Sequence, residues 1–219
     1  MNAAGAARKD ETTGTSDELL NLAERMFAER GVENVALTQI VAASSQRNRS
    51  ALHYHFGSRE GVLSALLDRR LAAINARREM LLDALPARPT VLAIARATVA
   101  ALGQTLVEEP WGRDYISILA QVRFHPRLLG ERAVLDEHLT GVRRTRRMMQ
   151  QAASPLPSAL VAERLTWFTD AVVFAMARWA QKTPAGPKAK AAMAVLIEEL
   201  ADFGAAAVAA PTHADRSEP

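Results

Sequence analysis

The sequence predicts an all-α protein of about nine helices, and three features of its 219 residues support this prediction. Apolar residues make up 49% of the chain and aromatic residues only 5%, so the core must consist largely of Ala, Leu and Val. Ala-rich and Leu-rich runs favour helix over strand. The 11 Gly and 10 Pro residues fall mostly between segments whose apolar residues recur at helical spacing.

The first helix is expected to follow a disordered arm over residues 1–15, which is polar and rich in small residues. Thr15 and Glu18 have the spacing of a capping box and predict where this helix starts. Its apolar stripe runs from Leu19 to Phe27, and Gly31 is expected to end it.

Two short helices are expected next, over residues 37–44 and 48–54, with a turn at 45–47. A turn of three or four residues between two short helices is typical of a helix-turn-helix. Ser58 is expected to cap a long fourth helix that ends before Pro86.

The remaining helices are expected to form a larger domain in which Pro and Gly separate the helices. We therefore divide the chain into the arm, a helix-turn-helix domain over 16–60, a larger helical domain over 61–209 and a flexible tail over 210–219. The helices expected in the larger domain after the fourth helix span residues 90–108, 111–124, 126–153, 158–182 and 188–209.

The distribution of charge indicates a polyanionic partner. The net charge of +3 says little, but no acidic residue occurs between Glu33 and Glu60. The basic or titratable side chains within this window are Arg47, Arg49, Arg59, His53 and His55.

Several classes of site are not expected. Without cysteine the chain has no disulfide, thiolate metal site or cysteine nucleophile. We expect no secretory signal, no membrane helix, no cofactor and no metal site, because the sequence shows no matching segment or ligand spacing. A cytoplasmic protein is therefore predicted.

Residues 46–50, which read Gln-Arg-Asn-Arg-Ser, have the composition of the base-contacting end of a recognition helix. Gln and Asn can pair with adenine and Arg with guanine. Leu52, Tyr54 and Phe56 would seat this helix on its own domain. The alternative is a solvated loop and a polar helix face in an ordinary helical domain.

Two runs carry a resemblance to a known family: residues 40–45 (Ile-Val-Ala-Ala-Ser-Ser) and residues 54–63 (Tyr-His-Phe-Gly-Ser-Arg-Glu-Gly-Val-Leu). Together they resemble the DNA-binding domain of the tetracycline-repressor (TetR) family. The most similar branch has a Gln-Arg-Asn turn before Ser-Ala and Tyr-His-Phe-Gly. The side chains expected to contact DNA are Thr38, Gln46, Arg47, Asn48, Arg49, Ser50, His53, Tyr54, Ser58 and Arg59.

The chain departs from the family pattern at three points. The turn glycine is replaced by Ser45, where a positive φ would cost roughly 1 kcal/mol. The usual Ser or Thr cap of the second helix is Ala36, which loses about 1 kcal/mol of capping. One extra residue precedes His55, so single base contacts assigned by position can be shifted by one.

The resemblance implies that the larger domain binds a small-molecule effector and forms a homodimer, which would contact double-stranded DNA at a roughly palindromic operator as a repressor. The residues expected in an effector pocket are Trp111, Tyr115, Phe124, Met148, Trp167, Asp170 and Phe174, with Gln121, Arg123 and His125 as further polar candidates. The broad apolar faces of the last two helices predict a dimer interface formed by Leu165, Phe168, Val172, Met176, Met193, Leu196, Ile197 and Leu200.

Two alternatives stay open at this point. The apolar faces of the last two helices can instead be buried within the monomer. The protein can also be a helical adaptor that binds only protein, or a helical enzyme, although no catalytic motif supports an enzyme.

Overall fold

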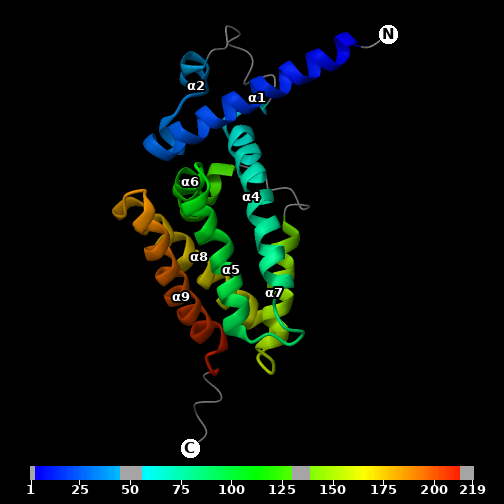
Figure 1. Ribbon diagram of the computed structural model, residues 1–219, viewed down its shortest axis with the longest axis vertical. Helices are drawn as coiled ribbons and strands as arrows, with labels where there is room; N and C mark the ends of the chain where they lie inside the picture. The colour runs from blue at the N-terminus through cyan, green and yellow to red at the C-terminus, as the bar shows by residue number, and fades with distance from the viewer. Residues whose placement is uncertain (1–2, 45–55, 130–138, 213–219) are drawn as a thin grey trace, which may run out of the picture. The chain divides into compact units, whose positions relative to one another are not determined.

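The computed structural model describes residues 3–44, 56–129 and 139–212, with side chains from residue 16 onward. Within these ranges the chain forms eight α-helices and two 3-10 helices and contains no strand (Figure 1). The all-α prediction is therefore confirmed.

The chain divides into two compact units. Unit 1 contains residues 1–70 and 117–134, and unit 2 contains residues 71–116 and 135–219. The division falls inside α4 (Arg59–Asp83) and α6 (Gly112–Phe124), so each unit contains part of both helices. The sequence predicts a domain boundary after residue 60. That boundary would place nearly all of α4 and the whole of α6 in the larger domain, whereas the structure divides both helices between the two units.

Unit 1 begins with α1 (Ala3–Arg30), followed by the short 3-10 helix η1 (Val32–Asn34) and by α2 (Leu37–Ala43). The predicted start of the first helix at Thr15 is wrong, because α1 begins at Ala3. Alanine has the highest helix propensity, and no proline interrupts the segment before Thr15. The predicted stop is confirmed, since Gly31 has a φ of +88° that favours glycine.

The core of unit 1 joins α1, α2 and the first part of α4. Its largest fully buried side chains come from the apolar stripe of α1, from α2, from two successive turns of α4 and from the part of α6 in this unit: they are Leu19, Phe27, Ile40, Leu63, Leu66 and Ile118. These buried residues hold α1, α2 and the start of α4 together. Of these elements, α2 and α4 are the two that flank residues 45–55.

Unit 2 contains the second part of α4 and the first part of α6. Its other helices are α5 (Val91–Glu108), α7 (Thr140–Ala152), α8 (Ser158–Lys182) and α9 (Pro187–Ala209). The predicted helix over 158–182 is confirmed to the residue. Thr90, the first residue of the predicted helix, is the N-cap of α5, and its Oγ1 accepts a hydrogen bond from the Ala93 N–H at 3.1 Å. The continuous helix expected over 126–153 is corrected, since Pro126–Leu129 is a 3-10 helix, η2, within unit 1.

Two glycines allow the helices of unit 2 to pack closely. A Cβ atom at Gly103 of α5 would lie 2.9 Å from Ile197 and Met193 of α9, and α5 and α9 run side by side (Figure 1). A Cβ atom at Gly204 of α9 would lie 2.1 Å from the ring of Phe168 on α8. The core therefore forms around α9, with α5 and α8 both in contact with it.

Among the described residues, α5 is the one helix long and apolar enough to pass a length-and-composition test for a membrane span. Half of it is buried inside the protein. Near its start, Arg96 forms an ion pair with Glu198 of α9 at 2.7 Å. These features are typical of a core helix in a water-soluble fold.

Candidate functional site

Two of the predicted DNA contacts lie at the start of α4. The Oγ of Ser58 accepts a hydrogen bond from the Gly61 N–H at 3.2 Å, which confirms Ser58 as the cap of α4. The Nε of Arg59 donates to the backbone carbonyl of Val35 at 3.1 Å. A guanidinium has five N–H donors, so this bond uses one of them.

The start of α2 compensates for the missing cap at Ala36. The Ala36 side chain cannot accept a hydrogen bond, but its backbone N–H donates to the Oε1 of Gln39 at 3.0 Å. This is the second half of a capping box, in which the side chain at the third helical position reaches back. Thr38, another predicted DNA contact, lies in this first turn and is exposed.

The other seven predicted DNA contacts lie outside the described residues: Gln46, Arg47, Asn48, Arg49, Ser50, His53 and Tyr54. The structure therefore places the helices on either side of this segment, together with Thr38, Ser58 and Arg59.

A buried ion pair holds α1 against α4 within unit 1. The Glu24 side chain on α1 is only 2% exposed, and both of its carboxylate oxygens accept hydrogen bonds from Arg70 of α4, from Nε at 2.9 and 3.1 Å and from Nη2. A buried carboxylate without a cationic partner would cost several kcal/mol in free energy. The pair therefore fixes the spacing of the two helices.

Arg69 extends this network toward the surface. Its Nη1 contacts Asp17 at 3.1 Å, and its Nη2 donates to Asn21 at 2.8 Å and lies 3.8 Å from Glu24. Burial, with the neighbouring charge of Arg70, holds the pKa of Arg69 below its ordinary value. The sequence analysis missed this network, although a Glu between Ala23 and Phe27 on an apolar stripe was a visible signal.

Gln121 belongs to unit 1 rather than to an effector pocket. Its Oε1 accepts a hydrogen bond from the Val32 N–H at 2.9 Å, and its Nε2 donates to the Phe27 carbonyl at 3.4 Å. The proposed role of Gln121 as a polar anchor for an effector is thus corrected. Its amide instead satisfies backbone groups at the end of α1 and the start of η1.

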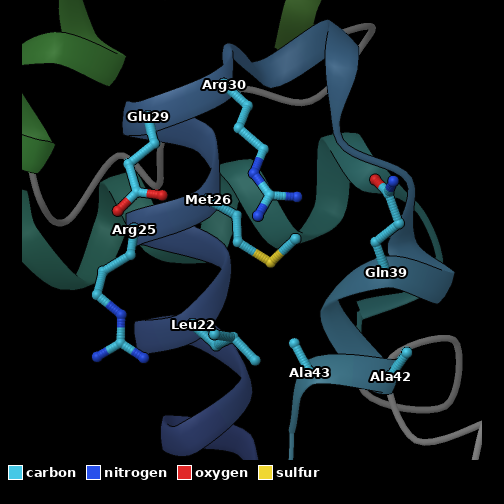
Figure 2. A pocket seen from close by; sticks show the side chains of 8 residues that line it. All are labelled: Leu22, Arg25, Met26, Glu29, Arg30, Gln39, Ala42 and Ala43. Carbon is cyan, nitrogen blue, oxygen red and sulfur yellow. The ribbon is translucent and has the colours of Figure 1, made fainter.

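A groove of about 420 Å³ lies between α1 and α2 in unit 1 (Figure 2). Leu22 and Met26 of α1 face the end of α2, where Ala42 and Ala43 complete an apolar floor. The charged and polar side chains around it are Arg25, Glu29, Arg30 and Gln39. Because the charges have both signs, the groove itself does not select an anionic or a cationic ligand.

The seven residues expected in one effector pocket differ in their exposure to solvent. Phe124 is 70% exposed and lies in unit 1, where its ring packs edge-on against His125. Trp167 is 59% and Phe174 38% exposed, so both lie on the surface of α8. The effector pocket stays a prediction for these three residues, which are exposed because apolar residues on a helix do not all face the same core.

The other members of the predicted pocket lie within unit 2. Tyr115 is buried and meets Trp111 edge-on, with ring centroids 6.0 Å apart. Met148 lines a cavity of about 630 Å³ between the end of α4, the following loop and α7, where Leu82, Asp83 and Arg144 also lie. Asp170 is half-buried on α8.

Most residues of the predicted dimer interface lie inside unit 2. Six of its eight residues are buried in the core of unit 2, with exposed fractions between 0 and 9%: Leu165, Phe168, Val172, Met176, Met193 and Ile197. Leu196 and Leu200 are half-buried. The alternative left open by the sequence therefore holds for these faces, which pack within the monomer.

Other apolar side chains remain on the surface of the last two helices. They are Trp167 and Phe174 on α8, seven residues apart and hence on one face, and Val195 and Phe203 on α9, with exposed fractions between 38 and 63%. Solvent-exposed aromatic residues of this size, gathered on two adjacent helices, are typical of a protein interface.

Comparison with protein families gives two matches. Residues 19–66 match the model described as bacterial regulatory proteins, tetR family. Residues 96–207, just over half of the chain, match the model described as tetracyclin repressor-like, C-terminal domain. No curated protein sequence matches the chain.

Solved structures with the same fold are distant in sequence. The ketosteroid transcriptional regulator KstR2 of Mycobacterium tuberculosis is 21% identical, with a TM-score of 0.56, over 86% of this chain and 94% of that one. The fatty acid degradation regulator FadR from Bacillus halodurans is 11% identical, with a TM-score of 0.58, over 90% of this chain and 99% of that one. At these identities the likeness shows the fold alone.

The Glu24 network yields a stability prediction. Glu24→Gln removes the charge that balances Arg70, whose side chain is only 13% exposed. Breaking one partner of a buried pair leaves an uncompensated charge, so we expect a loss of about 3 kcal/mol in the free energy of unfolding. Urea denaturation followed by far-UV circular dichroism measures this loss.

Glu29→Gln is the matched control, because Glu29 is exposed on the same helix. It should change stability by less than about 0.5 kcal/mol. Equal effects of the two substitutions would show that Glu24 is not the residue that holds α1 to α4.

Proposed function

Because the chain belongs to the tetracycline-repressor family of transcriptional regulators, we propose that it represses transcription by binding a roughly palindromic operator as a homodimer. A small apolar or amphipathic effector, bound by unit 2, would release it from DNA. The observation that carries this proposal is the match of residues 19–66 to the family's DNA-binding domain, over the helices that flank the predicted recognition segment.

Two features support DNA binding by unit 1. The window between Glu33 and Glu60 lacks acidic residues, so it would not repel a phosphate backbone. Thr38 is exposed in the first turn of α2, while Ser58 and Arg59 define the start of α4. These residues would contact phosphates on either side of the bases read by residues 46–50.

Two features support effector binding by unit 2. Residues 96–207 match the family's C-terminal domain, and the cavity beside Leu82 and Met148 has a volume in the usual range for a small-molecule site. A ligand that favours one arrangement of unit 2 would shift the protein away from the form that binds DNA. We also propose that the protein acts in the cytoplasm without catalytic activity.

The exposed apolar residues of α8 and α9 support a homodimer. Two copies of this face could pack as a four-helix interface, in which Trp167 and Phe203 would become buried. The half-buried Leu196 and Leu200 lie seven and three residues before Phe203 on α9, so these two predicted residues share its face. Two DNA-reading units related by a two-fold axis would require a palindromic site.

DNA binding is tested by a mobility shift with a labelled fragment from upstream of the protein's own gene. The full-length protein should shift the fragment, and its affinity should fall roughly a thousandfold between about 50 and about 200 mM salt, because bound phosphates release counterions. Gln46→Ala and Tyr54→Ala should each weaken specific binding by about tenfold or more.

Gln181→Ala, which changes an exposed residue of α8, serves as the matched control and should bind like the wild type. Failure to bind any fragment of the source genome in a specific, salt-sensitive manner would refute the repressor function.

The dimer is tested by Trp167→Glu and Phe203→Glu. Each places a charge in the proposed apolar interface, which should raise the dimer Kd by about a hundredfold or more and weaken operator binding in parallel. Sedimentation equilibrium measures the change. Met80→Glu is the control, since Met80 is 63% exposed on α4 rather than on α8 or α9. The proposal would be contradicted if the wild-type protein sedimented as a monomer, or if neither Trp167→Glu nor Phe203→Glu weakened the dimer.

A further inference from the structure

The core of unit 2 contains a buried cation without an anionic partner among the described residues. The Arg78 side chain on α4 is 9% exposed, and its Nη1 donates to the Oδ1 of Asn75, one turn earlier on the same helix. Its Nε is buried and has no hydrogen-bond partner within the described ranges. Asn75 is neutral, so the charge of Arg78 is not balanced there.

Three helices meet around this guanidinium. Asn75 and Arg78 lie on the inward stripe of α4, between the buried apolar residues Ile74 and Leu82. Gly141 of α7 lies against Asn75, since a Cβ atom there would be 2.9 Å from the Asn75 Oδ1. Tyr115 of α6 is 3% exposed and close enough to act electrostatically on Arg78.

Two nearby arginines on α4 and α7, unlike Arg78, form ion pairs. Arg77, the preceding residue, pairs with Glu108 at 2.9 Å, and Arg144 of α7 pairs with Asp83 at 2.7 Å and with Glu79. Each of these is more exposed than Arg78. The most deeply buried of these arginines is therefore the one without a carboxylate.

Such an arrangement is costly for the folded protein alone. Burial lowers the pKa of Arg78, with Tyr115 and Glu79 opposing the shift. A buried charge is usually paired, and one that is not is a candidate for binding a ligand of opposite charge. The nearest acid in sequence, Glu79, is engaged by Arg144.

We propose that Arg78 binds the carboxylate of the effector, and that the effector is a monocarboxylate with an apolar body. This inference rests on the proposed function, because it names the class of effector that unit 2 would take. A planar guanidinium can bind both oxygens of a carboxylate. The buried apolar residues around Arg78 suit a ligand with one charge rather than the two of a phosphate.

The first test needs no ligand and compares Arg78→Met with wild type by thermal unfolding. Replacing an uncompensated buried cation with an apolar side chain of similar length should raise the melting temperature, by about 2 °C or more. Arg147→Met removes the same charge from the exposed face of α7 and should leave the melting temperature nearly unchanged. A lower melting temperature for Arg78→Met would show that Arg78 is a structural cation and would overturn the proposal.

The second test uses matched probes: hexanoate, decanoate, benzoate and naphthoate, each against the alcohol with the same carbon skeleton. At least one carboxylate should stabilise the wild-type protein more than its alcohol, and calorimetry should give a Kd at least tenfold lower. Arg78→Met should remove this preference. Arg78→Lys keeps the positive charge but loses the planar guanidinium that can bind both carboxylate oxygens, so it should weaken carboxylate binding. This variant replaces Arg78→Met in the test if Arg78→Met does not fold.

The outcomes separate this inference from the proposed function, because both tests are run without DNA. If no carboxylate is preferred over its alcohol, or if both Arg78 variants bind carboxylates like the wild type, the inference is wrong even when the protein binds its operator. If carboxylates bind through Arg78 but no DNA fragment is bound, the inference stands and the repressor function fails.

Discussion

The carboxylate of Glu24, buried between α1 and α4, is the constraint on which the arrangement of unit 1 depends. A buried charge must be matched by an opposite charge at hydrogen-bond distance, and Arg70 provides that match through both carboxylate oxygens. Apolar contacts alone would allow α1 to slide or rotate on α4. The ion pair fixes one register, so α2 and the capped start of α4 lie at defined positions around the recognition segment.

Two arginines of α4, eight residues apart, show opposite electrostatic arrangements. Arg70 is neutralised by Glu24, and its pairing stabilises unit 1. Arg78 is buried with its hydrogen bond to a neutral amide, and it forms no ion pair with the described residues. A buried charge that costs stability is typical of a binding site, and this is the basis of the role proposed for Arg78. In unit 1 the ion pair of Glu24 and Arg70 determines how α1 and α4 pack. In unit 2 the ligand chemistry that we propose follows from Arg78, which has no such pair.

The sequence predicted the helix boundaries well where breakers or caps stand at the ends. Ser58 caps α4, and the prolines around residue 157 and the Gly186 turn delimit α8 and α9. It failed at the start of α1, where no breaker marks an end. It also failed for the effector and dimer residues, because helical periodicity identifies an apolar face but not the partner that covers it. Trp167, Phe168 and Phe203 are all aromatic residues, so the sequence does not distinguish them. Only Phe168 is buried, against Gly204, while Trp167 and Phe203 are exposed.

The measurement that tests this account most directly is a DNase I footprint of the full-length protein on the DNA fragment that it binds most tightly. A dimeric reader with one recognition segment in each copy should protect two half-sites related by a two-fold axis, about 10 base pairs apart from centre to centre or a multiple of that spacing. A single unsymmetrical half-site, or protection that does not depend on the sequence of the fragment, would contradict the account.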